Sequence, residues 1–176
     1  MQYLIRAFNE IKTSRLYALV RDVYNSSDCM SERLEEKFPT PESFEEYAAA
    51  LSVRPGSVAL AAEMDGALYG YLTIMPRYQA KLRHTSDLNM GVHHALRGKG
   101  VGRLLLREAL RLAGEAGILE IIYLMVRADN TPAIRLYEDM GFDHLAILKN
   151  DIKTPEMYYD GFLMRKFIKE FVRQNY

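Results

Sequence analysis

The 176-residue sequence has one cysteine, no tryptophan and no net charge. Because Cys29 alone cannot form an intramolecular disulfide, the sequence fits a reducing compartment. The 23 Lys and Arg residues balance 23 Asp and Glu residues, which argues against nucleic acid as a partner. No apolar run is long enough to span a membrane, and the first residues, MQYLIRAFNE, lack the apolar run of a signal peptide. We therefore expect a cytoplasmic protein that binds neither nucleic acid nor membrane.

The sequence also lacks internal repeats, low-complexity linkers and metal-ligand spacing. We therefore expect a single domain over residues 1–176, and 49% apolar residues provide it with a sizeable core. His93 and His94 are adjacent on a predicted strand and should point to opposite faces. With no cysteine or carboxylate at ligand spacing, we expect no metal site.

The first half of the chain indicates helices and antiparallel strands. The clearest feature is a hairpin over residues 57–75, in which Asp65-Gly66 suits a type I′ turn because both residues need positive φ. Gly70 inside its second strand indicates a bulge or a close backbone approach. The preceding segments predict a strand at Tyr3–Phe8, a helix at Lys12–Asn25 and a helix that begins at the cap Thr40 and at Pro41.

The second half indicates a βαβ unit followed by a helix and two strands. A strand at His84–Val92 leads through a glycine-rich loop into a helix that should end at Gly117. The strand Ile121–Val126 is apolar throughout, which predicts burial on both faces and a parallel pair. The next helix should be capped by Thr131 and end at Gly141. Two final strands are predicted over residues 142–149 and 158–167.

Glycines before a helix predict an anion site, and the spacing of Arg97-Gly98-Lys99-Gly100-Val101-Gly102-Arg103 separates three kinds of loop. A P-loop needs a Ser or Thr after its lysine, which is absent here. A dinucleotide-binding loop needs GxGxxG, whereas Gly98, Gly100 and Gly102 give GxGxG. Glu120 also precedes the buried strand instead of ending it. The third spacing, Arg-x-x-Gly-x-Gly, is the one that the loop satisfies.

That spacing belongs to a longer resemblance. The stretch "MGVHHALRGKGVGRLLL" resembles the signature of the GNAT superfamily of acetyl-CoA-dependent N-acetyltransferases. "AAEMDGALYGYL" resembles the central hairpin of that family, and "DNTPAIRLYEDMGF" resembles its second signature. The resemblance covers about residues 2–167. It implies an α/β fold with a mixed sheet of about six to seven strands, an antiparallel first half, a central parallel pair and about four helices.

The resemblance also implies a site for acetyl-CoA, and the physical chemistry of the loop agrees with it. Free N–H groups at a helix N-terminus bind phosphate, and glycines clear the approach of the pyrophosphate. Asn130 and Tyr137 are seven residues apart, which places them on nearly one helix face about 10 Å apart. The family role of Tyr137 is that of a general acid for the leaving CoA thiolate. The implied cofactor-binding residues are Met90, Val92, Arg97, Gly98, Lys99, Gly100, Val101, Gly102, Arg103 and Asn130.

The expected activity is transfer of an acetyl group from acetyl-CoA to a small-molecule or peptide amine by direct attack. A non-catalytic acyl-CoA-binding module is the alternative, and a homodimer stays open. No residue stands out as the general base. Asp87 and Asn89 share a face of the strand that leads to the cofactor, and Glu63 precedes the Asp-Gly turn, but none of them matches a diagnostic motif of the family. The segment from Asp28 to Glu46 contains seven acidic and two basic residues, and the last predicted hairpin adds Asp151, Glu156 and Asp160. Together they give the hypothesis of a cationic acceptor.

Overall fold

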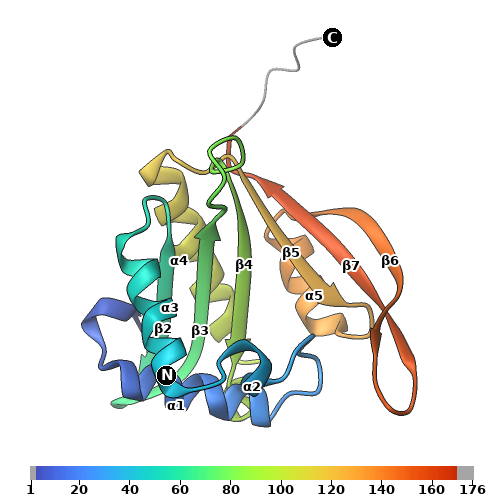
Figure 1. Cartoon of the computed structure of the whole chain (residues 1–176), viewed down its shortest axis with the longest axis horizontal. Helices are drawn as coiled ribbons and strands as arrows, with labels where there is room; N and C mark the ends of the chain where they lie inside the picture. Colours follow the sequence, from blue (N-terminus) through green and yellow to red (C-terminus); the bar gives the residue numbers. More distant parts are fainter. Residues whose placement is uncertain (1–2, 170–176) are drawn as a thin grey trace.

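The computed structural model describes residues 3–169, which form a seven-stranded mixed sheet with helices on both faces (Figure 1). The strands are β1 (Leu4–Ala7), β2 (Val58–Met64), β3 (Ala67–Pro76), β4 (Thr85–Val92), β5 (Ile121–Arg127), β6 (Asp143–Lys153) and β7 (Tyr158–Phe167). The helices of this part of the chain are α1 (Thr13–Asn25), α2 (Leu34–Lys37), α3 (Pro41–Val53), α4 (Val101–Ala116) and α5 (Thr131–Asp139), with 3-10 turns η1 (Phe8–Glu10) and η2 (His94–Leu96). The strand order is β1-β2-β3-β4-β5-β7-β6, which confirms the predicted class. Helix α2 is a single turn in the polar segment between α1 and α3.

Strands β1 to β4 form the predicted antiparallel half. Asp65 and Gly66 have φ of 50° and 78°, the two positive angles that a type I′ turn requires. The register between β2 and β3 shifts between Ala62 and Glu63, opposite the segment that contains Gly70, which confirms the bulge. A Cβ on Gly70 would lie 3.1 Å from side-chain atoms of α4, so the glycine also permits the close approach of that helix.

The parallel strands β4 and β5 pair over only part of their length and then separate. Only three residue pairs join the two strands, from Thr85 opposite Ile121 to Asp87 opposite Tyr123. Beyond Asp87 the strands diverge, and β4 continues to Val92 paired only with β3. Figure 1 shows the resulting gap widening toward the ends of both strands.

The prediction that β5 is buried on both faces is wrong. Ile122, Leu124 and Val126 pack in the same core as α4 and α5. The core on the other face is built from α1, α3 and strands β2 and β3, and it includes no residue of β5. Met125 is therefore 36% exposed and Tyr123 is only partly buried. The apolar sequence of β5 suggested that helices cover both of its faces. On one face, however, the packing of α1 and α3 does not extend to β5.

The helix ends follow the predicted residues with one correction. Thr40 accepts a hydrogen bond from the amide of Ser43, and Gly117 ends α4 with φ of 67°. Helix α5 is capped by Asn130, whose side chain accepts from the amide of Ala133, and not by Thr131. Asn130 has the Asx side chain that caps well, and Thr131 already lies within the helix. None of the helices within residues 3–169 is both long and apolar enough to cross a membrane.

Candidate active site

A cavity of about 720 Å³ lies where β4 and β5 diverge. Its walls come from the end of α1 and the segment after it, from β4, from the loop before α4, from the end of β5 and from α5. Ten of the eleven residues predicted for the site line it: Met90, Val92, Arg97, Gly98, Gly100, Val101, Gly102, Arg103, Asn130 and Tyr137. Lys99 is exposed and lies outside this lining.

The glycine loop between η2 and α4 and the first turn of α4 line this cavity. Gly98 and Gly100 have φ of 73° and 86°, and nothing lies within 4 Å of a Cβ added at either position. The first hydrogen bond of α4 runs from the amide of Leu104 to the carbonyl of Gly100. The amides before Leu104 therefore have no acceptor within the helix, which is the arrangement that binds phosphate.

Gly102 has a second role besides clearing the approach to these amides. A Cβ at this position would lie 3.1 Å from Cδ2 of Leu136 on α5. The glycine thus allows α4 and α5 to approach each other beside the cavity.

Two arginines of the loop, Arg97 and Arg103, already have hydrogen-bond or ion-pair partners within the protein. Arg97 donates to the carbonyl of Val92 at 3.1 Å and to the carbonyl of Ser26 at 3.0 Å. It therefore ties the end of β4 to the end of α1. Arg103 forms an ion pair with Asp139 of α5. Both partners of that pair are at least half exposed, so the pair is worth little and leaves Arg103 free to reorient toward an anion.

Tyr137 is buried in the wall of the cavity, with its ring centroid 5.7 Å from that of Phe142. Burial raises the pKa of its hydroxyl. The hydroxyl therefore remains protonated at neutral pH, as a proton donor must. Asn130, at the start of the same helix, also lines the cavity, and its side chain caps α5.

Arg127 is a site residue that the sequence did not reveal. It ends β5, is 4% exposed, and holds Asp129 through two hydrogen bonds of 2.6 and 2.9 Å. It also donates to the carbonyl of Asp28, and its guanidinium lies 4.1 Å from the ring centroid of Tyr159. An arginine at the end of an apolar strand, followed two residues later by an aspartate, was the available signal.

Neither Cys29 nor the pair His93 and His94 forms a nucleophilic or metal-binding site. Cys29 lines the cavity, and burial raises the pKa of its thiol, which disfavours the nucleophilic thiolate. The rings of His93 and His94 lie 4.2 Å apart. The prediction that they point to opposite faces is wrong, because His94 begins η2 instead of continuing the strand. Within residues 3–169, no group of three or more His, Cys, Asp or Glu residues could hold a metal ion.

The comparisons with known proteins agree with this geometry. Residues 14–142 match the acetyltransferase (GNAT) family, so the chain belongs to that family. It is an acetyl-CoA-dependent N-acetyltransferase.

Two curated relatives and two solved structures illustrate the likeness. The chain is 27% identical to the L-amino acid N-acetyltransferase AaaT of Escherichia coli, over 87% of this chain and 93% of that protein. It is 32% identical to the N-alpha-acetyltransferase RimI of Mycobacterium tuberculosis, over 64% of this chain and 67% of that protein. A GNAT acetyltransferase from Streptococcus pneumoniae superposes with a TM-score of 0.88 at 27% identity, covering 96% of this chain and 100% of that one. The putative acetyltransferase yncA of Salmonella typhimurium, solved with acetyl-CoA, superposes with a TM-score of 0.82 at 21% identity and 98% coverage of both chains.

Proposed function

We propose that this enzyme transfers the acetyl group directly from acetyl-CoA to a primary amine of a small molecule or peptide, with Tyr137 as the general acid. The observation that carries the proposal is the position of Tyr137. Its hydroxyl-bearing ring is buried in the wall of a cavity whose other walls are the open edge of β4 and the glycine loop. One cavity therefore brings together an anion site, an unpaired strand edge and a protonated acid.

The residues of the cavity would hold acetyl-CoA along its length. The unpaired amides at the start of α4 suit the pyrophosphate, with Arg103 and the exposed Lys99 as additional charges. The free edge of β4 at Met90–Val92 suits the amides of the pantetheine arm, in the manner of an added strand. Acetyl-CoA would supply the acetyl thioester, and a backbone N–H of this segment would polarise its carbonyl.

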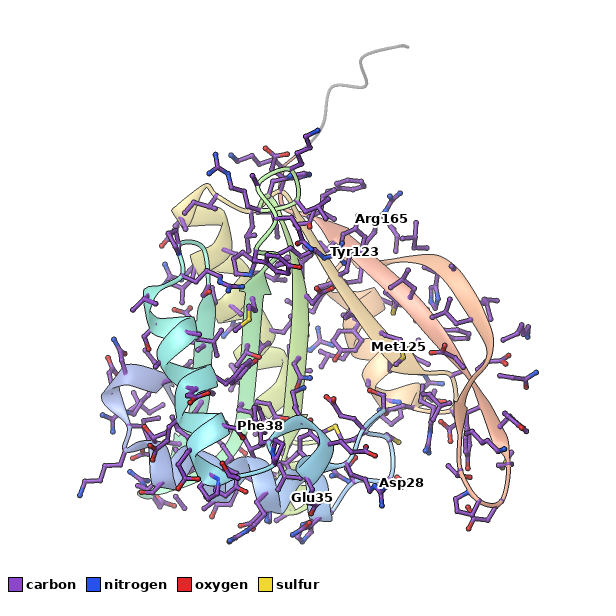
Figure 2. All side chains as sticks on the ribbon, viewed as in Figure 1. Asp28, Glu35, Phe38, Tyr123, Met125 and Arg165 are labelled. Carbon is purple, nitrogen blue, oxygen red and sulfur yellow. The ribbon has the colours of Figure 1, made fainter. Side chains whose placement is uncertain are left out.

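The acceptor would approach from the face of β5 that no helix covers. Figure 2 shows Tyr123, Met125 and Arg165 on one side of this opening and Asp28 and Glu35 on the segments across it. The surrounding charges do not favour the hypothesis of a cationic acceptor. Of the acidic residues between Asp28 and Glu46, only Asp28 lines the cavity, and its charge is paired with that of Arg127.

An amine panel tests the proposed function. Release of free CoA thiol from acetyl-CoA would be measured with amino acids, polyamines and short peptides as acceptors. We expect thiol release that requires an amine and rises with its concentration to saturation. Saturable binding of acetyl-CoA by calorimetry, with no amine-dependent release across the panel, would instead identify a non-catalytic acyl-CoA-binding module.

A further inference from the structure

The cavity between β4 and β5 is lined from both faces of the sheet. Side chains alternate between the two faces along a strand, so neighbouring residues line the cavity from opposite sides. Leu88 on β4 and Val126 on β5 line it from the face that α4 and α5 cover. Asn89 and Met125, the residues next to them in the sequence, line it from the other face. Because the glycine loop leads into α4 on the first face, the second face is left for the acceptor.

Three apolar side chains line the cavity on this second face and remain partly exposed in the folded protein: Met30, Met125 and Ile152. Met30 follows α1 and packs against the core of that face, on one side of the gap. Met125 lies on β5, on the other side. Ile152 on β6 is opposite Tyr159, whose ring packs on Arg127, so it shares the face of Met125. Apolar surface that the fold leaves uncovered in a cavity favours a ligand with an apolar group.

The charges at this end of the cavity are already paired. Arg127 holds Asp129 at 2.6 and 2.9 Å and pairs with Asp28 at 3.5 Å. Asp151 on β6 and Arg165 on β7 lie outside the lining, and Asp151 is exposed, so that water screens its charge. Within residues 3–169, no charged side chain that lines this end of the cavity lacks an opposite partner. A charged acceptor group would therefore lose water here without gaining a partner.

We propose that Met30, Met125 and Ile152 form the specificity pocket for the acceptor, and that the pocket takes an uncharged apolar group attached close to the reacting amine. This inference deepens the proposed function and rests on it. Methionine side chains are unbranched and adapt to ligands of different shape. The pocket should therefore accept straight, branched and aromatic apolar groups, whereas polyamines and lysine-like amines should be poor acceptors.

The test is kcat/KM of the wild type for a series of amino acids that differ only in the side chain. The series is alanine, 2-aminobutyrate, norvaline and norleucine, offered as free amino acids or as the first residue of a common peptide, whichever the amine panel shows to be acetylated. We expect kcat/KM to rise about 4-fold with each added methylene, as burial of apolar surface predicts. Ornithine, whose side chain has the length of that of norleucine but ends in an ammonium, should fall about 10-fold or more below norleucine.

Variants of Met125 assign this selectivity to the pocket. Met125→Glu should lower kcat/KM for norleucine about 10-fold or more and raise that for ornithine, because it places a carboxylate where the apolar group would lie. Met125→Ala should flatten the rise along the series, whereas Met125→Leu, which conserves volume, should keep it. The matched control is Met157→Glu, a methionine that is 51% exposed before β7 and lies outside the cavity lining. This control should keep the selectivity of the wild type, and the Kd for acetyl-CoA shows that each variant is folded.

The possible outcomes separate this pocket from the proposed function. Equal kcat/KM from alanine to norleucine, or ornithine as good an acceptor as norleucine, would overturn the pocket while the wild type still acetylates amines. A folded Met125→Glu variant that keeps the order of the wild type would overturn it as well. Absence of thiol release with every amine would overturn the proposed function, and the pocket with it.

Discussion

Arg127 connects residues that are distant in the sequence at the mouth of the cavity. It holds Asp129 after β5, the carbonyl of Asp28 after α1, and the ring of Tyr159 on β7. Because the guanidinium is planar and carries five donors, it can serve these partners at once, which a lysine cannot. The side chain therefore fixes the segment at residues 27–31 against the sheet.

Arg127→Lys should consequently destabilise the protein while keeping its charge. Loss of two hydrogen bonds to charged or carbonyl partners is expected to cost about 1–2 kcal/mol. That corresponds to a decrease in Tm of roughly 3–6 °C in thermal unfolding of a chain of this length. Arg111→Lys is the control, since Arg111 pairs with Glu108 and Glu115 on the exposed face of α4. An equal Tm for both variants would contradict this role of Arg127.

At the level of secondary-structure elements, the packing of helix α1 on strand β4 depends on Gly91. A Cβ there would lie 2.5 Å from Cγ1 of Val23 and 2.8 Å from Cε1 of Tyr71. The absence of a side chain at Gly91 thus allows Val23 of α1 and the ring of Tyr71 to pack against β4. The sequence predicted both elements, but only the packed structure shows why this position is a glycine.

Gly91→Ala should therefore destabilise the protein by about 1–3 kcal/mol through overpacking. Gly114→Ala provides a matched control on α4, where the nearest atom to the added Cβ is 3.9 Å away. That change should be neutral or stabilise by up to about 1 kcal/mol, because alanine favours the helix. Denaturant unfolding measures both, and the account fails if Gly91→Ala is as stable as Gly114→Ala.

For the molecule as a whole, the features that could be predicted from the sequence are turns and helix ends, because residues adjacent in the sequence determine them. Asp65-Gly66 determined the hairpin turn, Gly117 determined the end of α4, and the glycines before α4 determined the loop that lines the cavity. The open face of β5 could not be predicted, because it depends on where helices distant in the sequence end.

The central claim is that the cavity between β4 and β5 places a protonated Tyr137 at the leaving thiolate. The most direct test is to measure the kcat of the Tyr137→Phe variant at a saturating concentration of amine. Because the substitution removes only a hydroxyl, we expect kcat to fall about 10–100-fold while the Kd for acetyl-CoA, measured by calorimetry, stays unchanged. The control is Tyr158→Phe in the exposed β6–β7 hairpin, which should match the wild type. A Tyr137→Phe variant with the kcat of the wild type would contradict the account.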